Sequence, residues 1–90
     1  MKEKDVNPFY NRVDSMIRNK GMNHKELAES IGVTPVTLHR YLALERRCSL
    51  SVFMGICEEI DISAEDLFRT YTYARLEKRV DDYRRAENEV

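Results

Sequence analysis

The stretch NHKELAESIGVTPVTLHRYL, residues 23–42, contains the signals of two short helices separated by a tight turn. Asn23, with a glutamate three residues later, forms a capping-box pair that predicts the start of the first helix. Gly32 ends this helix, because glycine readily adopts the left-handed backbone conformation that a sharp turn requires. Thr34 and Pro35 then begin a second helix as N-cap and first helical residue. Three residues separate the two segments, and this spacing predicts a helix-turn-helix.

Helical patterns continue on both sides of this stretch. On its N-terminal side, Asn7 and Pro8 form another pair of N-cap and first helical residue, and apolar residues follow at helical spacing. On its C-terminal side, Ser49 and Ser63 are expected to cap two more helices, the last of which runs from about 64 to 86. No segment shows the alternation typical of a strand. The chain is therefore predicted to be all-α, with five helices.

Composition narrows the function classes. Ninety residues, 42% of them hydrophobic and 34% charged, suit one folded domain. There is no apolar run of membrane-spanning length and no signal-peptide pattern, so a cytoplasmic protein without a membrane partner is expected. Cys48 and Cys57 show no metal-ligand spacing with each other or with the two histidines, and we expect one loop thiol and one buried thiol. The sequence contains no catalytic motif, and we predict no enzyme activity, no metal and no cofactor.

The charge distribution is uneven although the formal net charge is only −1. Residues 1–48 carry nine Lys/Arg against six Asp/Glu, whereas residues 49–68 carry five acids and no basic residue. Residues 69–90 carry six basic residues against five acids. One end of the molecule is therefore suited to phosphates, and another is expected to repel them.

The helix-turn-helix stretch resembles a known family. Residues 23–34 are similar to the S-Q-x-x-L-A-x-x-x-G-V-S core of lambda-repressor/Cro-like regulators, also called the XRE family, and residues 38–41 to its I-S-R-x pattern. The V-S-x-x-x-L-F opening of the family's fifth helix is matched by Ile62, Ser63, Leu67 and Phe68. The resemblance covers about residues 8–68. It implies a five-helix lambda-repressor-like DNA-binding domain over residues 1–68. Residues 69–90 extend beyond the resemblance, and because no Gly or Pro interrupts them they are expected to form a C-terminal helical extension.

The sequence departs from the family pattern at four places. His24 replaces a glutamine that, in the family, braces the recognition helix and contacts a phosphate, and a neutral histidine performs only part of this role. Ala43 and Leu44 replace an Asn-Gly pair, and the segment from Ala43 to Cys48 is expected to be a basic loop. Cys48 stands where a proline is usual. Asp61 stands where a glycine is usual, and it tolerates the left-handed conformation less well.

In this motif the second helix lies in the major groove, and its N-terminal residues reach base edges. Leu38, Tyr41 and Leu42 are predicted to face the core. The outward face supplies the expected base contacts: Pro35, Val36, Thr37, His39 and Arg40. An exposed Val36 suits a thymine methyl group, although single exposed apolar residues are also normal. Arg40 can contact a guanine edge, a phosphate or an internal carboxylate.

Phosphate contacts are expected at helix N-termini and at the basic loop. The candidates are Asn23, His24, Lys25, Thr34, Arg46, Arg47 and Ser49. For Arg46 and Arg47 the alternative is an ordinary solvated loop.

These residues predict a sequence-specific transcriptional regulator, more specifically a repressor, whose partner is double-stranded DNA and which needs no small-molecule ligand. Two alternatives remain open. One is the antitoxin of a toxin–antitoxin pair, and the other is a protein-interaction module that has lost DNA binding. Salt-dependent binding to duplex DNA separates the last of these from the other two.

The predicted C-terminal extension carries an apolar seam of coiled-coil spacing. The seam consists of Tyr73, Leu76, Val80 and Tyr83, and charged residues surround it. A solitary helix would leave these side chains exposed, so we expect them to be covered. A homodimer is the preferred interpretation, and packing back on the protein's own core is the alternative.

Overall fold

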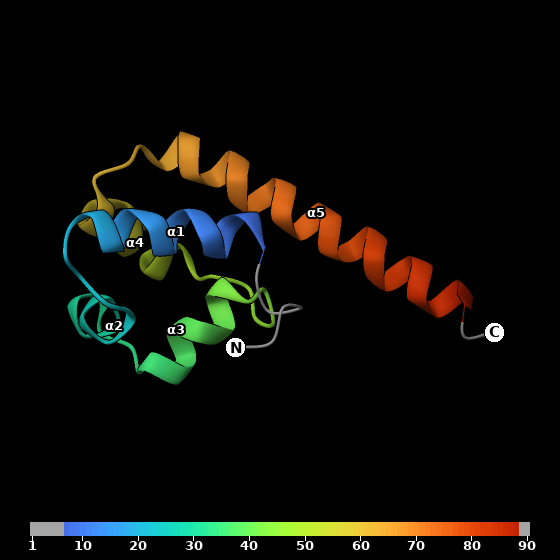
Figure 1. The fold of residues 1–90 in the computed structure, drawn as a ribbon, viewed down its shortest axis with the longest axis horizontal. Helices are drawn as coiled ribbons and strands as arrows, with labels where there is room; N and C mark the ends of the chain where they lie inside the picture. Colours follow the sequence, from blue (N-terminus) through green and yellow to red (C-terminus); the bar gives the residue numbers. More distant parts are fainter. Residues whose placement is uncertain (1–6, 89–90) are drawn as a thin grey trace.

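The computed structural model describes residues 7–88, and within that range it contains five α-helices and no strand, as the sequence predicts. The helices are α1 (Pro8–Asn19), α2 (His24–Ile31), α3 (Pro35–Leu42), α4 (Leu50–Ile60) and α5 (Ala64–Asn88). Figure 1 shows α1 to α4 gathered at one end of the molecule, with α5 crossing them and extending well beyond.

Each helix begins at the residue that its capping signal predicts. All five cap side chains accept a hydrogen bond from the backbone amide three residues later, at Asn7, Asn23, Thr34, Ser49 and Ser63. At Asn23 the capping box is complete, because the Glu26 carboxylate also accepts from the Asn23 amide at 3.1 Å. Such caps are worth about 1 kcal/mol each, so the helix starts are well defined by local chemistry.

Two helices are followed by a residue other than glycine in the left-handed conformation, which the sequence did not indicate. Gly32 adopts the expected left-handed conformation with φ of 78°. Asp61 also adopts it, with φ of 56°, and therefore replaces the usual glycine without changing the turn. Leu44 has φ of 63°, an uncommon value for a bulky residue.

The segment from Ala43 to Cys48 is a loop, as expected, but its first two residues belong to the core. Ala43 and Leu44 are buried, and only the residues after them are available to solvent or DNA. The Glu45 amide donates to the Arg40 carbonyl, which closes the end of α3 in the manner of a Schellman motif. Burial of a leucine side chain contributes about 1.5–3 kcal/mol, which offsets the cost of the left-handed backbone.

The hydrophobic core is built from all five helices. Its fully buried large side chains are Phe9, Val13, Ile17, Leu27, Leu38, Leu42, Ile56, Ile60 and Leu67. Helices α2 and α4 approach each other closely at Gly55, where a Cβ atom would lie 2.8 Å from Cγ2 of Ile31. The glycine therefore sets how near α2 can lie to α4.

Helix α5 is attached to α1 at its N-terminal end. The Arg12 guanidinium donates to both oxygens of Asp66, at 3.0 and 2.8 Å, and to the Thr70 hydroxyl at 2.8 Å. Leu67, Tyr71 and Ala74 are buried beside this contact. The packing thus continues past residue 68, where the resemblance ended, and a domain boundary at that residue stays a prediction.

The two thiols lie as expected, with Cys57 buried in α4 and Cys48 partly buried in the loop before it. Burial, and to a lesser degree the nearby Cys57, raises the pKa of the Cys48 thiol to about 12, so this thiol is protonated at neutral pH. Among residues 7–88, no helix has the length and apolar character needed to cross a membrane. The side chains of residues 7–85 include no cluster of three His, Cys, Asp or Glu able to hold a metal ion.

Candidate nucleic-acid interface

Helix α3 is fixed to the core along one face and exposed along the other. Leu38 and Leu42 are completely buried, and the side-chain amide of Asn7 donates to the Leu42 carbonyl at 2.8 Å. On the opposite face, Val36 is 63% exposed and Arg40 lies one turn further along, also exposed. Pro35 is exposed too. The rigid attachment of α3 therefore presents an apolar side chain and a cation side by side.

Two other residues of α3 are less available than expected. Thr37 is partly buried, and its backbone amide and hydroxyl both bond to the Thr34 hydroxyl, at 3.2 and 2.9 Å. His39 was expected to face outward, but it is half-buried, with its ring packed edge-to-face against Tyr10 at a centroid distance of 6.0 Å. The outward face of α3 is therefore narrower than the sequence indicated, because α1 covers one of its sides.

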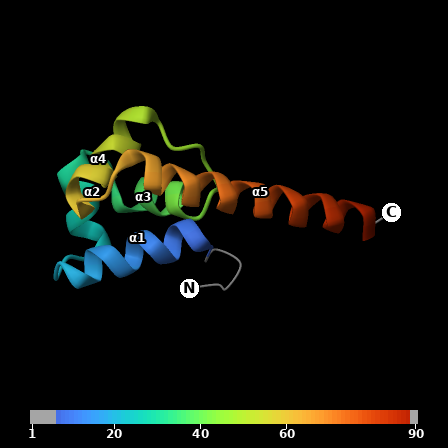
Figure 2. The same cartoon turned by 90° about the horizontal axis from the view of Figure 1, so that it is seen from above.

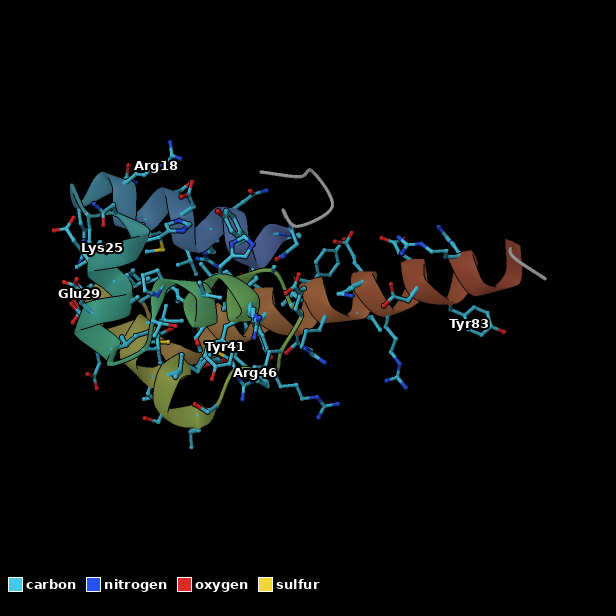
Figure 3. All side chains as sticks on the ribbon, turned by 90° about the horizontal axis from the view of Figure 1, so that it is seen from below. Arg18, Lys25, Glu29, Tyr41, Arg46 and Tyr83 are labelled. Carbon is cyan, nitrogen blue, oxygen red and sulfur yellow. The ribbon has the colours of Figure 1, made fainter. Side chains whose placement is uncertain are left out.

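The first turn of α2 carries an exposed lysine and a histidine that contacts α1. Lys25 is exposed and projects from α2 in Figure 3. The Nε2 atom of His24 lies 2.8 Å from a carboxylate oxygen of Asp14, and the ring packs edge-to-face on Tyr10. Asp14 also pairs with Arg18 at 3.0 Å. Asp14 was not among the predicted site residues, because its contact with α2 depends on how the helices pack.

The polar side chains that cap the helices are already occupied by backbone amides. Asn23, Thr34 and Ser49 each accept a hydrogen bond within their own helix start. Any contact of these segments with phosphates would therefore come from the remaining exposed amides of the first turns.

The two arginines of the loop after α3 contact different parts of the protein. The Arg46 guanidinium lies over the Tyr41 ring, 6.0 Å from its centroid. Arg47 lines a cavity against α5 instead. Figure 3 views the molecule from the side of α3, and it shows Lys25 on α2 and Arg46 at the loop on this same side. Lys25, α3 and Arg46 thus lie on the same side of the molecule.

The apolar seam of α5 lies outside the core. Tyr73, Leu76, Val80 and Tyr83 are 58%, 60%, 41% and 66% exposed. Figure 2 shows this part of α5 continuing past the other helices. Within the described chain the seam is therefore not covered by the protein's own core, and dimerisation stays a prediction.

The fold and the outward face of α3 define a helix-turn-helix DNA-binding domain. The model of the Cro/C1-type helix-turn-helix DNA-binding domain family matches residues 12–73, and the chain belongs to this family. A solved structure with a similar fold is that of the clp gene regulator ClgR from Corynebacterium glutamicum. The two sequences are 21% identical, the TM-score is 0.63, and the match covers 89% of this chain and 86% of the other. The search of curated proteins matched none to this sequence.

Proposed function

We propose that this protein is a transcriptional regulator that reads a specific DNA sequence by placing α3 in the major groove. The observation that carries the proposal is the exposed pair of Val36 and Arg40, one turn apart on a helix whose other face is locked in the core. The edge of an A·T pair offers a thymine methyl group, and the edge of a G·C pair offers two guanine acceptors. An apolar side chain beside a guanidinium is complementary to these two features.

The charges of the surface also support this orientation. Lys25 and Arg46 lie on the same side as α3. The first turns of α2 and α4 also carry backbone amides without an intrahelical acceptor, which suits phosphate binding. The acidic segment of residues 49–68 disfavours the alternative approach through α4 and the start of α5.

The first experiment compares Arg40→Ala with the wild-type protein on a site selected from random duplex DNA and on mixed-sequence DNA. A bidentate base contact contributes about 1–3 kcal/mol of discrimination, so affinity for the selected site should fall about 5- to 150-fold more than affinity for mixed DNA. Arg69→Ala is the matched control, because Arg69 is exposed on α5 and pairs with Glu65. An equal loss on both DNAs would make Arg40 a phosphate contact.

We also propose that the protein acts as a homodimer and as a repressor. Four large apolar side chains on one face of α5 form the dimer contact, and two copies of α3 then read two half-sites. A dimer bound across a promoter blocks access of the transcription machinery.

Sedimentation at micromolar concentration tests the dimer. The double variant Leu76→Ser/Val80→Ser should be monomeric and folded, whereas Leu50→Ser, which removes an exposed leucine from α4, should leave the mass unchanged. A wild-type monomer under these conditions would contradict the dimer.

A further inference from the structure

A basic cavity lies between the loop after α3 and the middle of α5. Its volume is about 460 Å³, and it is lined by residues of the loop and of about three successive turns of α5. Four cations contribute to its wall: Arg47, Arg75, Lys78 and Arg79. Leu44 and Leu76 supply apolar parts of the wall. Cations from two segments far apart in the sequence thus converge on one space.

The positive charge of this cavity is not neutralised by the protein. The acid among its lining residues is Asp82, which pairs with Lys78 at 3.3 Å. Among the side chains that the structure describes, those of residues 7–85, no carboxylate pairs with Arg47, Arg75 or Arg79. The guanidinium of Arg75 lies over the Tyr71 ring at 5.7 Å, a cation–π contact that holds its position. An anion in the cavity would relieve the repulsion among these groups.

A neighbouring cavity of about 410 Å³ shares Lys78 and Asp82 with the basic cavity but has the opposite charge balance. It is lined by four acids, Glu45, Glu77, Asp81 and Asp82, and by two cations, Lys78 and Arg85. Cations therefore exceed acids in the first cavity, and acids exceed cations in the second. Residues 72, 75, 76 and 79 follow the spacing of a single helix face, and this face carries the cations of α5 that meet Arg47.

We propose that the basic cavity binds a phosphate group through Arg47, Arg75 and Arg79. The planar guanidinium matches two phosphate oxygens at once, and several such groups around one hollow provide geometric selectivity that scattered lysines do not. The phosphate comes either from the DNA backbone beyond the base pairs read by α3 or from a free polyphosphate. Only the first source rests on the proposed function.

In the first arm of the test, the full chain is titrated with sodium triphosphate. Binding is measured from the changes in the NMR chemical shifts of the arginine Nε–Hε groups. The pocket variant is Arg75→Gln/Arg79→Gln, and Arg79→Gln alone is the milder variant at an exposed residue. The control is Arg69→Gln/Arg84→Gln, which makes the same change in charge on α5 outside the cavity. Triphosphate should bind the pocket variant about tenfold or more weakly than the wild type, and the control should bind like the wild type.

The second arm measures the salt dependence of binding to a mixed-sequence duplex that extends beyond the footprint of α3. The pocket variant should reduce the slope of log K against log salt by about 1–2 relative to the control. A difference in this arm alone identifies the DNA backbone as the source, and a difference in the first arm alone identifies a free polyphosphate. Equal behaviour of pocket variant and control in both arms overturns the proposal. A wild-type protein that binds no duplex contradicts the proposed function, and the triphosphate arm still decides the cavity.

Discussion

The two halves of α5 belong to one continuous helix but differ in what surrounds them. In the first half, residues 64–74, Leu67, Tyr71 and Ala74 are buried against the other helices. In the second half, residues 75–85, no side chain is buried, and Leu76 is 60% exposed. The same sequence of helical turns is therefore a core element at one end and a projecting arm at the other.

This difference shows how the arm is held in shape. Starting a helix is costly, whereas each further residue adds a hydrogen bond at little cost. The packed first half supplies the nucleus, and the second half continues it with the surface ion pair of Lys78 and Asp82 and the contact of Arg75 with the Tyr71 ring. Its apolar seam and its cations are then free to serve binding, because neither is needed for the fold of the domain.

The largest expected effect is a difference in stability between two variants, each of which replaces a leucine by alanine in one half of α5. Leu67→Ala should lower the free energy of unfolding by about 2–5 kcal/mol, because Leu67 is completely buried. Leu76→Ala should leave the stability of the monomer nearly unchanged. Denaturant unfolding at submicromolar concentration measures both. Similar losses in the two variants would mean that the arm packs on the core in solution.

A smaller difference in stability is expected between two variants that each lose a tyrosine hydroxyl. The Tyr71 hydroxyl accepts a hydrogen bond from the Cys48 amide at 3.1 Å, which connects α5 to the loop before α4. Tyr71→Phe leaves that partly buried amide without an acceptor and should cost about 1–3 kcal/mol. Tyr83→Phe, in the exposed half, should cost almost nothing. If the two changes had equal effects on unfolding, the connection through Tyr71 would be unimportant.

The smallest effect concerns pH. The hydrogen bond from Arg12 lowers the pKa of the Asp66 carboxyl below its ordinary value. A carboxyl with a lowered folded pKa stabilises the protein above the unfolded value of about 3.9, and this contribution is lost as the pH falls through the folded value. Asp66→Asn should therefore be less stable than the wild type near neutral pH, and the two should converge in acid. The control Asp81→Asn, in the projecting half, should retain the acid-dependent loss.

The sequence was sufficient to predict features that depend on neighbouring residues. Every cap side chain was predicted because capping requires only a polar residue and an amide three positions later. The turn at Gly32 and the buried face of α3 followed from backbone preference and helical spacing. For the same reason the exposure of Val36 was predictable, since it lies well away from Leu38 around the helix.

Features that depend on contacts between distant segments could not be predicted. Leu44 is drawn into the core against its own backbone preference, which no local pattern indicates. Asp14 contacts His24 because α1 and α2 pack together, and Arg47 lines the same cavity as Arg75 because the loop passes beside α5. From their charge alone, Arg46 and Arg47 were predicted to have the same role. In the structure they have different neighbours, because Arg46 lies over Tyr41 and Arg47 lines the cavity beside α5.

The close approach at Gly55 constrains how sequences of this fold can diverge. The branched methyl group of Ile31 occupies the space that any side chain at position 55 would need, and its rotamer is stiff. A substitution at either position alone leaves an overlap or a gap, so the pair can change only together, with a smaller residue at 31 accompanying a larger one at 55. Positions 31 and 55 are therefore expected to covary among relatives, and because α2 leads directly into α3, the covariation preserves the placement of the DNA-reading helix.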